Sequence, residues 1–552
     1  MSDAPSSHDF GPSSKPVETL ESVVIRFAGD SGDGIQLTGN QFTAASAAAG
    51  NDTATFPDYP AEIRAPVGTL AGVSGFQLHF SSKDILTPGD RSDVLVVMNP
   101  AALAAHKKWL KPGGVLIANA DAFNQKNLLM AGFAENPLEN DSLADYQLFK
   151  VDLARLTGQA LEGMGLSAKE IERCKNYFAL GMVFWLYERD VAIIEDEIDQ
   201  KFASKPLLKD ANHKVFQAGW NFGENTELFR IRYRVPAAQD IAPGRYRSVS
   251  GNEAVALGMV AASVQSGRQL FLGSYPITPA TDILHSLSTF KEFGVKTFQA
   301  EDEIAGICSA IGAAFGNALA ITTTSGPGVA LKTEAMGLAV MTELPLVIVN
   351  VQRGGPSTGL PTKTEQADLL QAIYGRNGES PMPVIAARSP SDAFEAAFEA
   401  CRVAIKYRTP VMLLSDGYIA NGAEPWLIPR VDTLPKIDAN LLTSVEQLNG
   451  EKLLPYLRDP GTLARPWIEL GNPGLEHRIG GLEKWDKTGH IAYDPQNHHN
   501  MVKLRQAKVD AVVQEIPATP ILGKESGELL VVTWGSPWGS ARTAVRDLID
   551  QG

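Results

Sequence analysis

The chain has 552 residues, enough for three or four domains of ~150 residues each. Its 44% hydrophobic content is ordinary for a soluble globular protein, and its net charge of −14 argues against nucleic-acid binding, because binding phosphates requires a basic surface. Three cysteines, Cys174, Cys308 and Cys401, lie far apart without a Cys-x-x-Cys pair. This spacing excludes a zinc ribbon or an iron–sulfur ligand set within the chain, so we expect no metal site here.

The low cysteine content also fits a reducing cytosol. The N-terminus lacks a basic-plus-apolar signal, and no apolar run reaches the ~20 residues needed to span a bilayer. We therefore expect a cytoplasmic protein that does not contact a membrane.

The first part of the chain predicts a flexible tail followed by a domain. Residues 1–20 are rich in Ser, Pro, Asp and Glu, as in a loose tail. Strand and helix patterns alternate over residues 21–235, which indicates an α/β domain. Strands are expected at 23–28, 94–98 and 115–118, and helices at 37–49 and 171–189. Proline and glycine in residues 236–246 then predict a linker.

A second α/β unit is expected over residues 247–424. Its strands are expected at 269–273, 296–299, 318–322, 346–350 and 411–414. Its helices are expected at 252–264, 280–288, 303–314, 329–341 and 391–406. This alternation predicts a parallel, doubly wound sheet.

The pattern changes after residue 424. Over residues 425–526 regular periodicity fades, which indicates an extended segment that crosses a partner surface. Residues 528–534 predict a new strand and 540–549 its helix. One strand and one helix cannot bury a sheet alone, so we expect the last part, residues 527–552, to be cut short or completed elsewhere.

The most informative motif is Tyr-Pro-Ile-Thr-Pro at residues 275–279, at the end of an apolar strand. Pro276 and Pro279 fix their own φ and favour extended backbone in the residue before them. The loop is therefore stiff, and the hydroxyl of Thr278 is held at the carboxyl end of a strand. In open α/β sheets ligands bind at that end, which suits a compact substrate.

Three acidic residues, 301–303, stand between a strand and a helix. Acids favour the positive end of the helix macrodipole, so helix stabilisation is the simpler explanation. A sharper hypothesis singles out Glu303, because the small residues at 305–314 would let another surface approach closely. A carboxylate in such a dry contact could exchange a proton with a cofactor nitrogen.

Residues 322–328 end a strand in a turn rich in hydroxyls and glycine. The turn needs only to be a helix start capped by Ser325 or Thr324. Alternatively, backbone N–H groups at Ser325 and Gly326 face an anion or a cofactor ring. The sequence favours neither.

The loop at 352–364 is harder to explain as packing. Arg353 follows an apolar strand closely, and arginine binds carboxylates through two parallel hydrogen bonds without losing its charge. Two glycines beside it let backbone approach a ligand, and Thr358 and Thr362 add hydroxyls. An ion pair at the strand end is the alternative, but we favour a carboxylate-binding loop because Thr278 lies at an equivalent strand end.

Three further features carry weaker signals. The loop at 29–34 opens a helix, but it lacks the spacing of a dinucleotide fingerprint and the P-loop lysine, so a tight turn is as good an explanation. Arg64 lies in a proline-rich loop where a surface arginine is the default. His498 and His499 have no other His or Cys nearby at ligand spacing, which predicts solvated loop histidines.

Taken together, these residues resemble the 2-oxoacid:ferredoxin oxidoreductases, specifically an α subunit with a γ domain fused at its N-terminus. The resemblance extends over roughly residues 21–552. It rests on Tyr-Pro-Ile-Thr-Pro at 275–279, the glutamate motif at 300–303, Arg-Gly-Gly-Pro-Ser-Thr-Gly-Leu-Pro-Thr at 353–362, Gly-His-Ile at 489–491 and Thr-Trp-Gly-Ser-Pro at 533–537. Residues 353–366 are most similar to the 2-oxoglutarate branch, with a pyruvate or branched-chain 2-oxoacid enzyme as the alternative.

The resemblance implies a fold and a reaction. The fold is a γ-type α/β domain, a pyrimidine-binding domain of thiamine diphosphate enzymes and the start of a transketolase C-terminal-like domain. The reaction converts a 2-oxoacid, coenzyme A and oxidised ferredoxin into acyl-CoA, CO2 and reduced ferredoxin. Thiamine diphosphate with Mg2+ supplies the carbon nucleophile, and an iron–sulfur cluster of the [4Fe-4S] type accepts electrons singly.

The resemblance also implies roles for individual residues. Glu303 matches the glutamate that contacts the aminopyrimidine nitrogen and promotes ylide formation, with Ser325 and Gly326 beside the cofactor. Thr278 and Arg353 match the residues that hold the 2-oxo-carboxylate end of the substrate.

Three weaker assignments follow from the same resemblance. Thr362 matches a further polar contact, and Arg64 falls where relatives place a basic residue near the substrate's distal carboxylate. Coenzyme A is expected near the N-terminal domain, close to Gly32, Asp33 and Gly34.

The chain departs from the family pattern in its diphosphate motif. Gly32-Asp-Gly34 has no asparagine at the usual downstream interval. Family logic places that motif and the cluster cysteines on a separate β subunit, so we expect an αβ or (αβ)2 complex that passes electrons to ferredoxin. The rival from another class is a non-catalytic nucleotide-binding or scaffold protein that uses the loop at 29–34.

Overall fold

The computed structural model describes residues 15–61, 65–239 and 241–551. The chain forms two compact units, Met1–Pro243 and Gly244–Gly552, and the division falls inside the segment expected to be a linker. Each unit has its own hydrophobic core.

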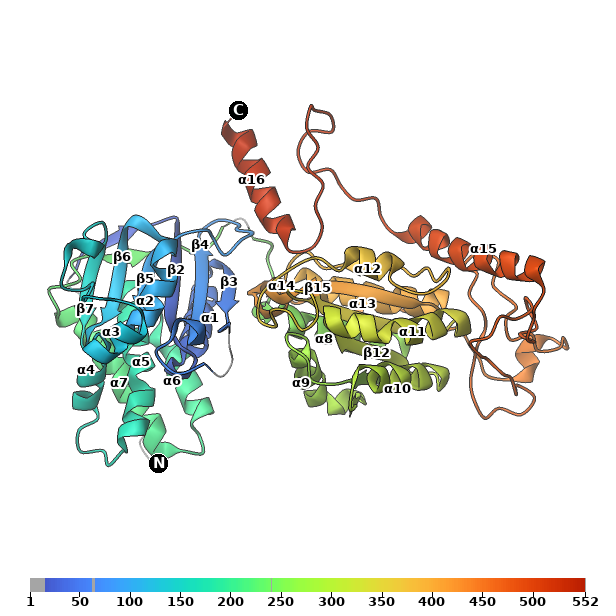
Figure 1. Cartoon of the computed structure of the whole chain (residues 1–552), viewed down its shortest axis with the longest axis horizontal. Helices are drawn as coiled ribbons and strands as arrows, with labels where there is room; N and C mark the ends of the chain where they lie inside the picture. Colours follow the sequence, from blue (N-terminus) through green and yellow to red (C-terminus); the bar gives the residue numbers. More distant parts are fainter. Residues whose placement is uncertain (1–14, 62–64, 240, 552) are drawn as a thin grey trace. The chain divides into compact units, whose positions relative to one another are not determined.

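The first unit is built on a mixed six-stranded sheet (Figure 1). In spatial order its strands are β3 (Asp52–Asp58), β4 (Val73–Ser81), β2 (Ser22–Asp30), β5 (Ser92–Val97), β6 (Leu110–Asn119) and β7 (Gln147–Val151). The strands β2 and β4 pair antiparallel, as do β3 and β4, whereas β2, β5, β6 and β7 run parallel. A short parallel pair joins β1 (Val17–Thr19) to β8 (Arg232–Arg234).

Seven α-helices of the described part cover this sheet. They are α1 (Ile35–Ala48), α2 (Pro100–His106), α3 (Gln125–Met130), α4 (Leu153–Ala160), α5 (Ala168–Leu186), α6 (Val191–Lys201) and α7 (Pro206–Asn225). The helices α5 and α7 approach closely because a glycine of each helix faces the backbone of the other helix. A Cβ at Gly181 would lie 2.2 Å from the carbonyl oxygen of Phe216, and one at Gly219 would lie 2.1 Å from that of Phe178.

The second unit contains a six-stranded sheet in which every paired strand is parallel. In spatial order its strands are β11 (Lys296–Gln299), β10 (Leu270–Ser274), β12 (Leu319–Thr324), β13 (Leu346–Gln352), β15 (Pro410–Asp416) and β14 (Val384–Ala386). The predicted doubly wound α/β fold is therefore confirmed.

Helices pack on both faces of this sheet, and each face has its own core cluster (Figure 1). One face carries α8 (Gly251–Ser266), α9 (Thr281–Thr289) and α13 (Asp392–Tyr407). The other carries α10 (Glu303–Phe315), α11 (Gly326–Thr342) and α12 (Leu369–Tyr374). The short helix α14 (Gly417–Asn421) follows β15, and β16 (Ala423–Leu427) pairs antiparallel with β9 (Tyr246–Ser250).

The segment after β16 is more regular than the sequence predicted. It contains the short pair β17 (Leu441–Leu442) and β18 (Trp467–Ile468), and an 18-residue helix, α15 (Pro495–Val512). His498 and His499 lie in the first turns of α15, so the prediction of loop histidines is wrong; His498 Nδ1 lies 2.6 Å from a carboxylate oxygen of Glu483. The helix escaped prediction because several of its buried side chains are charged, among them Arg505 and Lys508.

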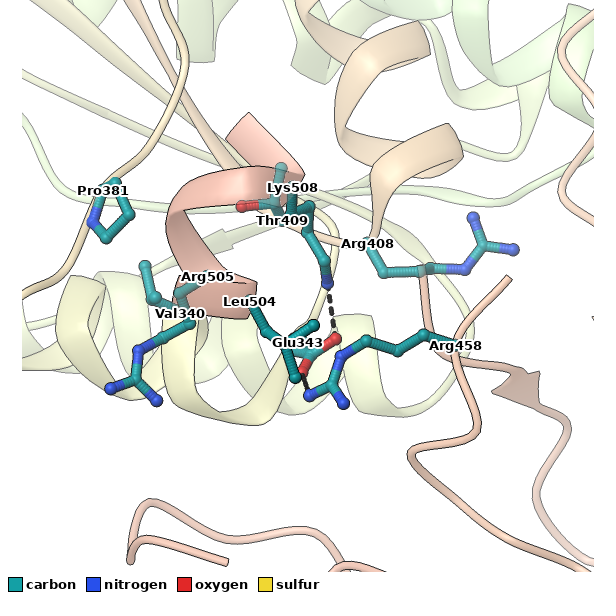
Figure 2. A pocket seen from close by; sticks show the side chains of 9 residues that line it. All are labelled: Val340, Glu343, Pro381, Arg408, Thr409, Arg458, Leu504, Arg505 and Lys508. Atoms are coloured by element: carbon teal, nitrogen blue, oxygen red, sulfur yellow. Dashed lines mark hydrogen bonds and ion pairs between the residues drawn. The ribbon is translucent and has the colours of Figure 1, made fainter. Parts of the chain in front are cut away.

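Charged contacts attach this segment to the C-terminal end of α11 (Figure 2). Glu343 is 4% exposed and forms ion pairs with Arg458 and Lys508. Arg465 Nε donates to the carbonyl oxygen of Thr342 at 3.0 Å, and Lys484 Nζ to that of Met341 at 3.1 Å. Burial raises the pKa of Glu343, but the two cations outweigh burial and hold that pKa at about 2. The segment is thus clamped onto a helix of its own unit.

The strand predicted at 528–534 is absent from the structure, where these residues form no strand. Residues 528–532 are exposed, for example Leu529 at 84% and Val532 at 84%, whereas Thr533 and Trp534 are half-buried. A strand requires a neighbouring strand to satisfy its backbone, and no described strand of this chain pairs with this segment. The helix that follows, α16 (Pro537–Gln551), includes the predicted residues 540–549.

Candidate functional site

Four predicted site residues follow neighbouring strands of the second sheet at the same edge. Thr278 follows β10, Glu303 follows β11, Ser325 follows β12 and Arg353 follows β13. Because all these strands are parallel, their carboxyl ends meet at one edge, where loops of an open α/β sheet bind ligands. The topology therefore brings these residues to one edge of the sheet.

Arg353 and the Thr278 loop are in direct contact. Nη1 of Arg353 donates to the carbonyl oxygen of Thr278 at 2.7 Å, and Nη2 to that of Thr358 at 3.0 Å. The arginine is 9% exposed, and burial lowers its pKa. Among the described residues its Nε has no hydrogen-bond partner. The guanidinium thus ties two loops together through backbone carbonyls, and within the described chain it does not form the ion pair that was the alternative.

The loop after Arg353 folds back on itself. Gly354 N donates to the carbonyl oxygen of Lys363 at 2.9 Å, and Leu360 N to that of Gly354 at 2.8 Å. Gly359 has a φ of +52°, and a Cβ there would lie 1.9 Å from the carbonyl oxygen of Gly354. Only glycine fits that position. Thr358 in this loop is exposed, and Thr362 is half-buried.

Two acidic residues at the start of α10 have different positions. Asp302 is the N-cap, and its carboxylate accepts from Ala305 N at 2.8 Å. Glu303 is the first residue of α10 and is half-buried. Its neighbours Ile304 and Cys308 are exposed, the former at 52%. Glu303 therefore lies beside small and apolar side chains that another surface can contact.

Tyr275 links the Glu303 carboxylate to the end of β12. Its hydroxyl lies 3.1 Å from Oγ1 of Thr324. Burial raises the pKa of Tyr275, and a hydrogen bond with Glu303 raises it further. A Cβ at Gly328 would lie 2.5 Å from that hydroxyl and 3.1 Å from Cγ of Glu303. The glycine leaves the space in which these two side chains meet.

Lys332 lies beneath this group and was missed by the sequence analysis. It occupies α11, is 0% exposed, and its Nζ donates to the carbonyl oxygen of Glu303 at 2.7 Å. A single lysine in a helix gives no signal in the sequence. Its position four residues after Gly328, on the same helical face, was the available clue.

The turn at Ser325 is not a side-chain cap. Ser325 precedes α11 but its hydroxyl makes no capping bond, and within the described chain that buried oxygen has no hydrogen-bond partner. The carboxylate of Asp368 lies against Gly326, 2.7 Å from the position of a Cβ there, and accepts from Asn350 Nδ2 at 2.9 Å. An acid at the start of α11 disfavours an anion, so of the two proposed ligands a cofactor ring fits better.

The Gly32–Gly34 loop belongs to the first unit and is acidic. Asp33 accepts from Asp30 N at 2.8 Å and forms an ion pair of 3.0 Å with Lys175. Burial raises the pKa of Asp30, and the nearby charge of Asp33 raises it further. Gly34 has a φ of +72° at the start of α1, as a tight turn requires. Arg64 lies outside the described residues.

Two searches of the described residues were negative. No helix there is long and apolar enough to cross a membrane. The same residues contain no group of three or more His, Cys, Asp or Glu side chains that could hold a metal ion.

Two family models match the chain. Residues 262–493 match a model described as pyruvate flavodoxin/ferredoxin oxidoreductase, thiamine diphosphate-binding. Residues 24–222 match a model described as pyruvate ferredoxin/flavodoxin oxidoreductase. The first match includes all four residues at the edge of the second sheet.

Individual relatives agree with the family models. The chain is 56% identical to 2-oxoglutarate oxidoreductase subunit KorA of Mycobacterium tuberculosis, over 98% of this chain and 82% of the relative. It is 35% identical to 2-oxoglutarate synthase subunit KorA of Methanothermobacter thermautotrophicus, over 54% of this chain and 76% of the relative. A solved structure, the 2-oxoglutarate:ferredoxin oxidoreductase from Magnetococcus marinus with 2-oxoglutarate, coenzyme A and succinyl-CoA bound, has a TM-score of 0.81 and 31% identity, over 97% of this chain and 86% of that one.

Proposed function

The chain belongs to the family of 2-oxoacid:ferredoxin oxidoreductases, and from this premise we propose that it is the α-type subunit of a 2-oxoglutarate:ferredoxin oxidoreductase. The reaction consumes 2-oxoglutarate, coenzyme A and oxidised ferredoxin and yields succinyl-CoA, CO2 and reduced ferredoxin. The choice of 2-oxoglutarate is supported by the 56% identity to a subunit named for that substrate. The observation that carries the site is the contact between Arg353 and the Thr278 loop beside Glu303.

Thiamine diphosphate fits the edge of the second sheet. Glu303 presents a half-buried carboxylate beside exposed Ile304 and Cys308, and the hydroxyl of Ser325 is buried without a partner among the described residues. We assign Glu303 to a ring nitrogen of the cofactor, with Ser325 and Gly326 alongside the ring. When bound, the cofactor supplies the carbon nucleophile for the 2-oxo carbon.

The substrate's 2-oxo-carboxylate group is assigned to Arg353 and Thr278. The N–H groups of Arg353 that do not donate to Thr278 and Thr358 suit a carboxylate, and the hydrogen bond to the Thr278 carbonyl fixes the guanidinium relative to the loop that carries the threonine hydroxyl. Thr362 is proposed as a further polar contact.

Arg64 stays a prediction for the distal carboxylate of 2-oxoglutarate. Arg64→Ala is expected to weaken use of 2-oxoglutarate relative to pyruvate. An unchanged preference would remove the assignment.

Coenzyme A is proposed to bind near Gly32, Asp33 and Gly34 of the first unit. Lys175, which pairs with Asp33 at 3.0 Å, is a cation at this loop that a phosphate would meet. Lys175→Ala is expected to raise KM for coenzyme A without changing KM for the 2-oxoacid.

A partner β subunit is proposed to carry the diphosphate site with Mg2+ and a [4Fe-4S] cluster. This chain has three separated cysteines and no Cys-x-x-Cys pair to ligate a cluster. Exposed apolar residues near Glu303 suit a subunit contact, for example Phe298 at 47%, Ile304 at 52% and Leu331 at 55%. Ferredoxin is proposed to dock on the β subunit, because this chain is acidic.

Reconstitution with the β subunit tests the proposal. A panel of 2-oxoglutarate, pyruvate and a branched-chain 2-oxoacid is assayed with a viologen acceptor and with coenzyme A present or omitted. We expect CoA-dependent reduction with 2-oxoglutarate and its loss in Glu303→Gln. Preference for pyruvate would instead indicate the pyruvate type. A colourless monomer that binds ATP would support the non-catalytic rival.

A further inference from the structure

Lys332 is a buried cation without an ion pair in the described chain. Its Nζ donates to the carbonyl oxygen of Glu303 at 2.7 Å and to Oγ1 of Thr322 at 3.1 Å, and lies 5.3 Å from the centre of the Tyr275 ring. The strongest favourable charge acting on it is that of Glu303. Its partners thus all belong to the group of residues that surrounds the assigned glutamate.

This position is an unfavourable one for a lysine. The ammonium lies at the first residue of α10, the positive end of that helix, where the macrodipole repels a cation. The side chain is 0% exposed, and an apolar side chain would normally fill such a space at lower cost. A costly buried charge beside a site indicates a functional role rather than a packing role.

A glycine of α11 leaves space for this group of side chains. At Gly328, one turn before Lys332, a Cβ would lie 2.0 Å from Oγ1 of Thr324, 2.5 Å from the hydroxyl of Tyr275 and 3.1 Å from Cγ of Glu303. Gly328 therefore keeps room for the side chains of Tyr275 and Glu303 next to Lys332.

We propose that Lys332 is a positioning residue for Glu303. Its ammonium holds the first turn of α10 through the Glu303 carbonyl, and its positive charge attracts the carboxylate that is assigned to the ring nitrogen of the cofactor. The step concerns one proton, exchanged between a carboxylate oxygen and that nitrogen, with no electrons transferred. The inference rests on the proposed role of Glu303.

The charge of Lys332 is sensitive to pH. Burial lowers its pKa to about 8, opposed by the charges of Glu303, Cys308 and Asp302 on or beside α10. Tyr275 faces it from the end of β10 and has a raised pKa. Lys332 is therefore expected to lose its charge as pH rises above about 8.

The chain offers a matched control at the other end of α11. Lys484 is 3% exposed, donates to the carbonyl oxygen of Met341 at 3.1 Å, and lies 5.4 Å from the centre of the Tyr456 ring. Burial also lowers its pKa to about 8. It is a second buried lysine, which reaches α11 from the segment before α15 and does not contact Glu303.

The test uses the αβ complex loaded with thiamine diphosphate and without 2-oxoacid. Hydrogen–deuterium exchange at the thiazolium C2 position is followed by acid quench and NMR, and protonation of the aminopyrimidine ring by its ultraviolet absorbance. We expect Lys332→Met to slow exchange at least tenfold at pH 7 and to lower the pH at which the ring protonates. Lys484→Met should stay within twofold of wild type.

Two comparisons distinguish the effect of the Lys332 charge from a structural effect of the substitution. The ratio of wild-type to Lys332→Met exchange rates should narrow to below threefold at pH 9.5, where the wild-type lysine is neutral. In a Glu303→Gln background, Lys332→Met should have no further effect. Should Lys332→Met not assemble with the partner, Lys332→Gln is measured in the same way.

The outcomes distinguish the two proposals. If Glu303→Gln abolishes exchange while Lys332→Met stays within twofold of wild type at pH 7, the role of Lys332 is wrong and that of Glu303 stands. If Glu303→Gln exchanges like wild type, the assignment of Glu303 itself fails.

Discussion

Arg353 donates to the carbonyl oxygen of Thr278 across 2.7 Å, which joins the loops that follow β13 and β10. These residues are 75 positions apart in the sequence. The strand β12 separates β10 and β13 in the sheet. The contact therefore spans an intervening strand and forms a continuous rim over the end of the sheet. Arg353 therefore links two loops, in addition to the role proposed for it in binding the substrate carboxylate.

Replacing this arginine should affect one substrate selectively. In the reconstituted complex, Arg353→Met is expected to raise KM for the 2-oxoacid at least tenfold, because the carboxylate loses its charged partner, and to leave KM for coenzyme A near wild type. Arg353→Lys should recover part of the loss, since it keeps the charge without the planar fork. An equal rise in both KM values would contradict the assignment.

The fold of the signature loop depends on Gly359. In Gly359→Ala the new Cβ would lie 1.9 Å from the carbonyl oxygen of Gly354 at a φ of +52°. We expect at least a tenfold loss of kcat/KM for the 2-oxoacid, because the loop that receives the Arg353 hydrogen bond must shift. Gly378→Ala is the matched control, with a φ of +64° and no atom within 4 Å of its Cβ position. Similar losses in both variants would mean that backbone strain, not the clash, is responsible.

The buried acid Glu343 should contribute strongly to stability. Glu343→Gln leaves Lys508 buried without its counter-charge and Arg458 with Asp486 alone, and loss of one partner of a buried pair typically costs about 3–5 kcal/mol. Asp432→Asn is the control, because the Arg430–Asp432 pair is exposed and such pairs contribute about 0–1 kcal/mol. Urea denaturation of the full chain measures both.

The contribution of Glu343 to stability should depend on pH. The pKa of Glu343 in the folded chain is about 2, below its ordinary value of 4.5. Its contribution is therefore complete above pH 4.5 and is lost as pH falls toward 2, because the unfolded chain takes up the proton first. The difference between wild type and Glu343→Gln should shrink over that range. A difference that stays constant would contradict the charge interpretation.

The charged form of Lys332, unlike that of Glu343, should destabilise the fold. Its pKa falls from 10.5 to about 8 on folding, so between these values the unfolded chain binds the extra proton and stability rises with pH. Lys332→Met removes this effect. Relative to wild type, the variant should lose about 1–3 kcal/mol of stability on going from pH 7 to pH 10.5, because only wild type gains from deprotonation. Denaturation at the two pH values measures the change, and a constant difference would indicate a purely structural lysine.

The sequence alone determined the architecture of the second unit and the edge where its site lies. Alternating strands and helices require parallel strands, and parallel strands bring their carboxyl ends together. Thr278, Glu303 and Arg353 each follow such a strand, so their convergence could be predicted before any coordinates. The motifs at 275–279 and 353–362, together with three weaker ones, likewise indicated the family, which the relatives then confirmed.

Only the tertiary structure decided which groups each site residue contacts. The donors of Arg353 face backbone carbonyls of Thr278 and Thr358, and backbone positions cannot be read from residue types. Lys332 carries no motif, and its meaning comes from the Glu303 carbonyl that it reaches. The helix α15 shows no apolar periodicity in the sequence because several of the side chains that it buries are charged. Residues 528–534 have the apolar pattern of a strand, but the described chain has no strand to pair with them. Periodicity records which side chains prefer burial, but burial of a charge and pairing of a strand depend on neighbours distant in the sequence.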